Sequence, residues 1–357
     1  MIRIGVIGLG KFGLQHLRCM KQLERQGRVE LLAICSRSEA TLTGRLAEFP
    51  GPTGYTDWRR MLDEAQLDAV TIVTPDHLHR PMALAALERG LHVLVEKPMD
   101  TTTEGCNQLI EAAEKADRLL QVDFHKRYDP EHINMRGEYA AGKLGEALYG
   151  YVHMEDRIEV PVDWFPGWAP DSSPAWFLGV HFYDLFHFIT GLKAESVMAV
   201  GNKRKLEGLG IPAWDHVSVQ VRYEGGACCY FDSSWILPRG FEAIVNQGIR
   251  IVGTEGMWEC DSQYRGSQSA TEAEGMRTWN NNFLREESDK QGRSVFKGYG
   301  IESIADFVEN LEALAQDASL ADLAGTYPDG EAGLEATAIA QAAHRSLASG
   351  QVESVTR

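Results

Sequence analysis

The stretch Ile2-Arg3-Ile4-Gly5-Val6-Ile7-Gly8-Leu9-Gly10-Lys11-Phe12-Gly13 opens the chain and decides the fold of its first part. An apolar run of strand length ends in a turn with the spacing G-x-G-x-x-G, and helical spacing of apolar residues follows. In such a unit Gly8 permits the tight turn, Gly10 lets the backbone approach a pyrophosphate, and Gly13 lets the helix pack closely on the strand. The stretch therefore predicts a dinucleotide site with the diphosphate at the helix N-terminus.

The first third of the chain alternates short apolar runs with helical patterns. We expect strands at residues 2–7, 31–35, 69–74, 92–95 and 119–124, and helices at residues 12–25, 39–48, 81–89 and 102–116. Alternation of this kind predicts parallel β-α-β units with helices on both faces of the sheet. Residues 1–125 are therefore expected to form an α/β, dinucleotide-binding Rossmann domain.

The pattern changes after residue 125. Strand-like runs are expected at residues 148–155, 196–201, 217–223, 227–234 and 243–252, and helices at residues 178–190, 301–315 and 331–349. Short turns between consecutive strands predict antiparallel pairing. Residues 126–357 are therefore expected to form an α+β domain with a large, mostly antiparallel open sheet, which binds substrate and whose last helix can pack back on the first domain. Residues 261–297 are polar and are expected to form a surface excursion.

Composition and charge exclude several classes of protein. The net charge of −16 disfavours nucleic acid and anionic membranes as partners. The sequence contains no run of 18 apolar residues and does not begin with the pattern of a secretion signal. Its six cysteines show no C-x-x-C spacing, which is typical of a reduced compartment. We therefore expect a cytoplasmic protein whose ligands are small molecules.

The end of the second expected strand bears on the choice of cofactor. Sites that prefer NAD place an Asp or Glu there to bind the ribose 2′-hydroxyl, whereas this chain has Ser36 and Arg37. A serine hydroxyl can donate to a 2′-phosphate, and a guanidinium adds a planar fork and a fixed positive charge. Alternatively, Arg37 stacks on the adenine or points to solvent. The residues favour NADP over NAD.

Three motifs that follow one another along the chain resemble those of the Gfo/Idh/MocA family, the group of glucose–fructose oxidoreductase and inositol dehydrogenase. They are the glycine turn, Thr74-Pro75-Asp76-His77-Leu78-His79 and Glu96-Lys97-Pro98. The likeness continues through Gly179-Val180-His181-Phe182-Tyr183-Asp184 and extends over essentially the whole chain. We accordingly expect the cofactor to contact Gly8, Gly10, Lys11, Phe12, Gly13, Ser36, Arg37, Thr74, Pro75, His79, Glu96, Lys97 and Arg127.

The resemblance also implies catalytic roles. In that family the lysine of the Glu-Lys-Pro motif lies beside the nicotinamide and the reacting hydroxyl, often near a cis peptide before the proline, and Lys97 would take this role. The acid–base residue comes from the second domain, which points to His181. Asp184, one helical turn later, would orient His181 or bind a substrate hydroxyl. The alternative is that His181 is a buried structural histidine in a helix rich in phenylalanine.

One position departs from the family. Relatives that resemble inositol dehydrogenase carry an Asp four residues before this histidine, where this chain has Phe177. The aromatic residues Trp164, Trp168, Trp176 and Phe177 suit the C–H faces of a sugar, but they equally suit core packing. No metal site is expected, because steps of three residues turn a helix by about 300°, so His181, Asp184 and His187 do not converge.

These observations predict a dehydrogenase or reductase that uses NADP or NAD and acts on a hydroxyl or keto group of a sugar, cyclitol or related polyol. The open sheet needs a cover, so we expect a homodimer or homotetramer formed through it. Two alternatives use the same fold. One is a dinucleotide-binding regulator without catalysis, and the other is a glycosidase that retains its cofactor.

Overall fold

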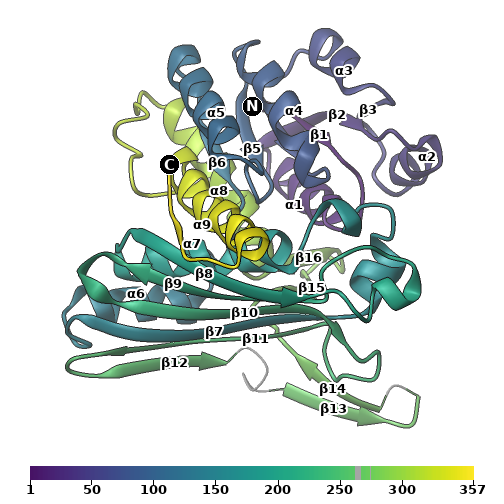
Figure 1. Cartoon of the computed structure of the whole chain (residues 1–357). Helices are drawn as coiled ribbons and strands as arrows, with labels where there is room; N and C mark the ends of the chain where they lie inside the picture. Colours follow the sequence, from purple (N-terminus) through teal and green to yellow (C-terminus); the bar gives the residue numbers. More distant parts are fainter. Residues whose placement is uncertain (262–266, 274) are drawn as a thin grey trace. The chain divides into compact units, whose positions relative to one another are not determined.

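The computed structural model describes residues 1–261, 267–273 and 275–357 (Figure 1). The chain divides into two compact units: residues 1–128 with 282–334, and residues 129–281 with 335–357. Within the described residues, no helix combines the length and the apolar character needed to cross a membrane.

The first unit is built on a parallel sheet of six strands in the order β3-β2-β1-β4-β5-β6. The strands are β1 (Ile2–Ile7), β2 (Val29–Cys35), β3 (Thr53–Tyr55), β4 (Ala69–Ile72), β5 (His92–Val95) and β6 (Leu120–Val122). Every neighbouring pair is parallel, which confirms the expected Rossmann sheet. Only the short β3 was not expected from the sequence.

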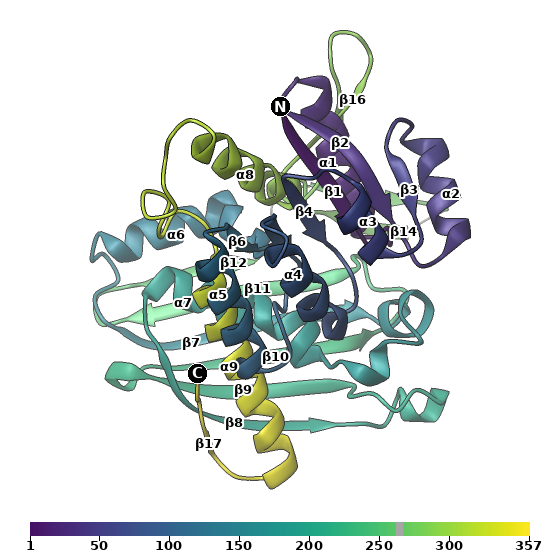
Figure 2. The same cartoon turned by 90° about the horizontal axis from the view of Figure 1, so that it is seen from above.

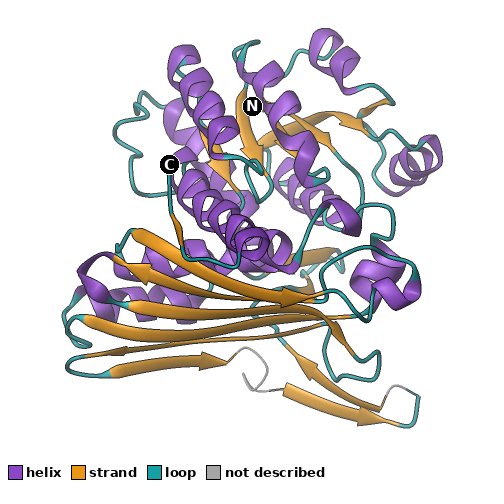
Figure 3. Ribbon diagram, in the orientation of Figure 1, coloured by secondary structure: helices purple, strands orange, loops and turns teal. Residues whose placement is uncertain are grey.

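Helices connect these strands (Figure 3). They are α1 (Gly13–Arg25), α2 (Glu39–Glu48), α3 (Trp58–Glu64), α4 (His79–Leu87) and α5 (Thr103–Ala116). The four longer helices match the expected ones to within two residues at each end. The seven-residue α3 was missed because it spans too few turns to display a clear apolar period.

The expected single boundary near residue 125 does not describe how the chain divides. Helix α8 (Tyr299–Leu314) belongs to the first unit, where Ile304 and Phe307 are buried in one core with Leu17 and Met20 of α1. The short strands β15 (Arg285–Ser288) and β16 (Ser294–Lys297) form a hairpin in the same unit. The first unit is therefore completed by a segment that follows the second sheet in sequence.

The second unit contains a seven-stranded sheet in the order β12-β11-β7-β10-β9-β8-β17. The strands are β7 (Ala147–Arg157), β8 (Ala194–Asn202), β9 (His216–Tyr223), β10 (Cys228–Leu237), β11 (Val245–Gly253), β12 (Met257–Asp261) and β17 (Glu353–Ser354). Its pairs are antiparallel, as expected, except that β7 and β10 are parallel. That pair is exceptional because β7 and β10 are separated by a helix and two strands and are not joined by a short turn.

Helices of the second unit pack on one face of its sheet. On α7 (Val180–Thr190), Phe186 packs its ring against Tyr223 of β9 and Phe231 of β10. Alternate residues on the opposite face, including Tyr151 and Tyr230, are exposed. Strands β11, β7, β10, β9 and β8 lie side by side in this order (Figure 2). As expected, α7 ends at Gly191, which has a left-handed backbone with φ of 73°. Helix α6 (Pro130–Ala140) was missed, although Asp129 and Pro130 form a recognisable helix start.

The polar segment 261–297 is only partly the plain surface excursion that we expected. It contains the hairpin β13 (Ser267–Thr271) and β14 (Gly275–Trp279) as well as β15 and β16. Residues 262–266 and 274 of this segment lie outside the described residues. Helix α9 (Gly330–Ser349) forms as expected, and only the short strand β17 follows it among the elements described.

Candidate functional site

The glycine turn brings three strand ends together. The Gly8 amide donates to the Cys35 carbonyl oxygen at the end of β2 (2.9 Å), and a Cβ added to Gly8 would lie 2.0 Å from the Val73 carbonyl oxygen after β4. Gly8 has a φ of 99°, which only glycine adopts readily. A Cβ on Gly13 would lie 2.1 Å from the Gly8 carbonyl oxygen, so both positions exclude a side chain.

Gly10 differs from these two glycines in having open space around it. A Cβ built on Gly10 would meet no atom within 4 Å. The position therefore leaves room for a ligand against the backbone, just before the N-terminus of α1 at Gly13. Lys11 is exposed and Phe12 is half-buried beside this space. A dinucleotide with its pyrophosphate at Gly10 fits these residues.

The tip of β2 carries the residues expected to choose between the two cofactors. Ser36 is half-buried, and its amide donates to the Tyr55 carbonyl oxygen (3.1 Å), while Arg37 is exposed. Arg45 of α2, which sequence reasoning missed, donates from Nε to the carbonyl oxygen of Leu9 in the glycine turn (3.4 Å). Two guanidinium groups therefore belong to the segment that follows β2.

His79 connects two loops rather than presenting its ring to a ligand. Its Nδ1 lies 2.7 Å from the Pro98 carbonyl oxygen and its Nε2 lies 2.7 Å from the Thr74 carbonyl oxygen. The ring is fully buried, and burial lowers the pKa of His79. His79 therefore links the exposed Pro75 turn to the loop after β5, and its contribution to a cofactor site would be indirect.

Glu96 and Lys97 follow β5 directly and are both buried, with 6% and 9% of their surfaces exposed. The Lys97–Pro98 peptide is cis, as the family resemblance implied. Burial raises the pKa of Glu96 to about 7, although the adjacent Lys97 charge opposes that rise. A buried lysine at the carboxyl end of a parallel strand lies where ligands bind in such sheets.

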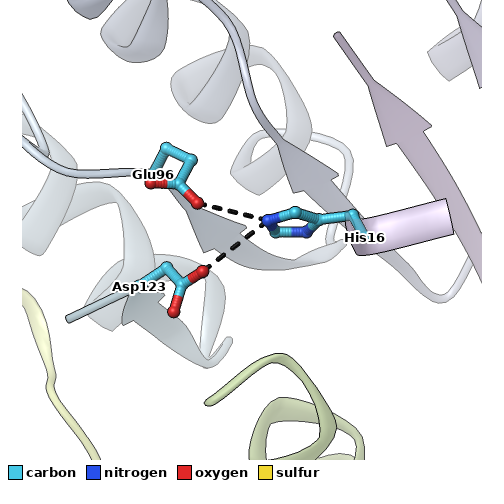
Figure 4. A group of neighbouring side chains, drawn as sticks. All are labelled: His16, Glu96 and Asp123. Atoms are coloured by element: carbon cyan, nitrogen blue, oxygen red, sulfur yellow. Dashed lines mark hydrogen bonds and ion pairs between the residues drawn. The ribbon is translucent and has the colours of Figure 1, made fainter. Parts of the chain in front are cut away.

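Two further residues, His16 and Asp123, join Glu96 in a buried cluster that sequence reasoning missed (Figure 4). Nε2 of His16 on α1 lies 3.2 Å from Oε1 of Glu96 and 3.6 Å from Oδ2 of Asp123, which follows β6. His16 is fully buried, and Asp123 is 1% exposed. An available signal was the carboxylate of Asp123 directly after an apolar strand, at the sheet edge where the cofactor motifs end.

The basic segment His125–Tyr128 follows β6. Its Lys126 side chain is buried, and its Arg127 side chain is half-buried. The ring of His125 packs against Phe12 (5.8 Å between centroids) and stacks on Tyr299 (5.7 Å). The segment is thus held against the start of α1 and against α8 by aromatic packing, which fixes the backbone that carries Arg127.

In the second unit, His181 and Asp184 are both buried on α7. The helical segment begins earlier as a single wider turn, Ala175–Gly179, and such π-type turns often occur at functional sites. Phe177 lies in this turn, one turn before His181. The face that carries His181 therefore begins with a phenyl ring in the place of the family carboxylate.

The expected aromatic substrate residues do not form one group. The Phe177 ring packs against Trp168 (5.2 Å between centroids), Phe165 (5.8 Å) and Trp235 (6.1 Å). Trp176 instead stacks on His344 of α9 with 12° between the planes, which is a packing contact. Trp164 touches Phe165 edge-on at 6.4 Å. Trp168 and Phe177 thus belong to one aromatic cluster that does not include Trp176.

Comparison with known families places the chain in a class. The model of the oxidoreductase family with an NAD-binding Rossmann fold, Gfo/Idh/MocA, matches residues 2–124, and the model of the GFO/IDH/MocA C-terminal domain matches residues 132–259. The chain belongs to the Gfo/Idh/MocA oxidoreductase family.

Two curated relatives are similar to parts of this chain. Inositol 2-dehydrogenase 2 of Saccharopolyspora erythraea is 33% identical over 212 residues, which are 59% of this chain and 60% of that protein. A glycosyl hydrolase family 109 protein of a Shewanella species is 33% identical over 63% of this chain and 54% of that protein. The chain thus matches less than two thirds of the length of either relative.

A solved structure shares the fold over the full length. Scyllo-inositol dehydrogenase of Lactobacillus casei, with bound NAD(H) and scyllo-inositol, is 19% identical, and the match covers 99% of both chains with a TM-score of 0.78. At that identity the likeness concerns the fold alone.

Proposed function

We propose that this protein is a nicotinamide-dependent dehydrogenase or reductase that acts on a hydroxyl or keto carbon of a sugar, cyclitol or related polyol. The observation that carries the proposal is Lys97, a buried cation at the carboxyl end of β5 in the unit that contains the glycine turn. A relative named inositol 2-dehydrogenase 2 and the motifs shared with its family support the polyol class.

The chemistry divides between the cofactor and the chain. A bound nicotinamide would supply the hydride acceptor. Lys97 donates a hydrogen bond to the substrate oxygen and stabilises the negative charge that develops there. His181 accepts the hydroxyl proton as the carbon–hydrogen bond breaks and the carbonyl bond forms, and in reduction it returns that proton. Asp184, one turn along α7, orients the imidazole or binds a neighbouring hydroxyl.

The experiment is a screen of oxidised and reduced sugars and cyclitols with both nicotinamide cofactors. The absorbance of the reduced nicotinamide ring measures turnover. We expect turnover with at least one polyol, and loss of it in both Lys97→Ala and His181→Ala. Tight cofactor binding without turnover of any substrate would instead favour the alternative of a dinucleotide-binding regulator without catalysis.

We further propose that NADP is the preferred cofactor, because Ser36 and Arg37 occupy the tip of β2 where NAD sites carry a carboxylate. Arg37→Ala should weaken NADP far more than NAD, since only NADP has a 2′-phosphate. Arg25→Ala, an exposed cation in the last turn of α1, is the matched control. An equal loss of affinity for both cofactors would remove the phosphate role.

A second candidate function is a glycosidase that retains its cofactor, which the relative named glycosyl hydrolase family 109 protein favours. The two functions give different products. A glycosidase would release nitrophenol from nitrophenyl glycosides with no net change in reduced cofactor, whereas a dehydrogenase would change the cofactor in proportion to product.

We propose that the exposed sheet face of the second unit forms a homodimer or homotetramer. Tyr149, Tyr151 and Tyr230 are each between 45% and 47% exposed on that face. Exposed aromatic side chains grouped in this way are typical of a protein–protein interface. Tyr151→Asp should reduce the mass measured by light scattering. An unchanged mass would exclude this face as the interface.

A further inference from the structure

The His16–Glu96–Asp123 cluster holds two carboxyl groups in surroundings that favour a single negative charge. Carboxylates this close repel strongly where water is excluded. Burial raises the pKa of Glu96 to about 7, and burial together with the Glu96 charge raises the pKa of Asp123 well above its usual value. Burial lowers the pKa of His16 to about 4, so its ring is neutral. At neutral pH these shifts favour one proton shared between the two carboxyl groups.

The positions of the polar atoms make Glu96 the common acceptor. A neutral His16 donates from Nε2, the nitrogen 3.2 Å from Oε1 of Glu96. A proton on Asp123 would let this carboxyl group donate to Glu96 as well, and the interaction lowers the pKa of Glu96. The Lys97 amide donates to Oε2 at 3.3 Å. The one negative charge therefore resides on Glu96, next to Lys97 in the chain.

We propose that Asp123 and His16 are positioning residues for Lys97, acting through Glu96 by keeping that carboxylate ionised and fixed in place. The Lys97 charge favours the ionised Glu96, and by reciprocity an ionised Glu96 favours the charged Lys97. When Glu96 takes up a proton, Lys97 loses its neighbouring counter-charge. The inference rests on the proposed dehydrogenase function, in which the Lys97 ammonium binds the substrate oxygen.

Other elements packed around the cluster also act on it. On the turn Asp76–Leu78, the Asp76 charge raises the pKa of Glu96. On α8, the buried Ser303 hydroxyl lowers the pKa of Asp123, against the larger effect of burial. The Cys19 thiol of α1 and the Tyr128 phenol in the turn after β6 also lie within reach of the Asp123 charge. Burial raises the pKa of both groups first, Asp306 then adds to the rise at Tyr128, and an ionised Asp123 adds to the rise at both.

A proton fits the charge of this site better than a divalent cation does. With one carboxyl proton, the cluster and Lys97 together have no net charge. A divalent cation between two carboxylates beside the same ammonium would leave a net positive charge in a buried site, which is costly.

The kinetic experiment compares two substitutions of Asp123 in the full chain. In a plot of kcat/KM against pH, activity falls on the acid side where an essential group takes up a proton. The part of this fall that Glu96→Gln abolishes belongs to Glu96, and we call it the acid limb. Asp123→Ala removes a donor to Glu96 and should raise this limb by about one to two pH units, the shift expected for a lost hydrogen bond to a charged group. Asp123→Asn keeps an N–H donor and should leave the limb near its wild-type position, and His16→Leu should raise it.

The control is Asp306→Ala, which removes a half-buried carboxyl group of the same unit. Asp306 accepts from Tyr128 (2.6 Å) and Gln121 (3.0 Å) and, unlike Asp123, is not among the groups that act on the pKa of Glu96. It should lower stability without moving the acid limb. A limb at the same pH in Asp123→Ala and Asp123→Asn, or an equal shift in Asp306→Ala, would overturn the positioning role.

An infrared measurement tests the shared proton without any substrate. At neutral pH we expect a carbonyl band from a protonated carboxyl group that disappears in Asp123→Asn. If no polyol is turned over, the proposed function fails while this band still decides the state of the cluster. An unchanged spectrum would overturn the proposal. So would a stoichiometric divalent metal, found by elemental analysis of the wild type, that Asp123→Asn removes.

Discussion

Replacing Gly10 with alanine separates cofactor binding from folding. A Cβ at Gly10 meets no atom within 4 Å, so the free energy of unfolding should stay within about 1 kcal/mol of the wild-type value. The added methyl group would occupy the space where we propose that the pyrophosphate approaches the backbone. We therefore expect the Kd for NADPH to rise at least about tenfold, which corresponds to about 1.4 kcal/mol of binding free energy.

Gly13→Ala is the matched comparison, because its methyl group meets protein instead of open space. The Cβ would lie 2.1 Å from the Gly8 carbonyl oxygen, whereas ordinary contact begins at 3.4 Å, so α1 would have to move by more than 1 Å. Overpacking of this kind costs about 1–3 kcal/mol. Gly13→Ala should therefore lose stability as well as affinity, while Gly10→Ala loses affinity alone.

The assays are urea unfolding followed by tryptophan fluorescence, and titration of each variant with NADPH followed by the fluorescence of the reduced nicotinamide. The two measurements use the same protein preparations. If Gly10→Ala binds NADPH within a factor of about two of wild type, the pyrophosphate does not lie against this turn and the reasoning from the glycine spacing is wrong.

Three further predictions concern the two units. Lys97→Ala should lower kcat/KM by at least about 100-fold and change the cofactor Kd little, as steady-state kinetics and titration would reveal; unchanged turnover would remove Lys97 from the mechanism. Phe177→Asp should increase kcat/KM for myo-inositol, because it adds a carboxylate one turn before His181, and it should lower stability by about 2–4 kcal/mol through lost aromatic packing; a decrease with myo-inositol would count against the comparison with the family. The folded-state pKa of Glu96 is raised from 4.5 to about 7, so its burial destabilises the fold progressively as pH rises through that range. Glu96→Gln should then gain stability relative to wild type between pH 5 and pH 8 in urea unfolding, and an equal difference at both pH values would contradict the raised pKa.

Local patterns were sufficient for most of the first unit. The strand, glycine turn and helix at residues 2–25 form as expected because the apolar period, the glycine spacing and the turn all act over neighbouring residues. The motif at Glu96 and Lys97 follows β5, as expected. Short elements such as α3 were missed because seven residues show too little periodicity.

Long-range pairing was not predictable in the same way. The parallel contact of β7 with β10 depends on which strand enters the space between β7 and β9, and short turns carry no information on that choice. Likewise, the apolar face of α8 is evident in the sequence, but nothing local indicates that it packs on α1 more than 270 positions earlier.

The amino-acid sequence by itself determined the order of the elements, the glycine turn and the residues that carry the proposed chemistry, because these depend on spacing along the chain. Only the tertiary structure decided which polar groups are buried together. His16 and Glu96 lie 80 positions apart, and their charges depend on each other because folding removes both from water and leaves Asp123 beside them.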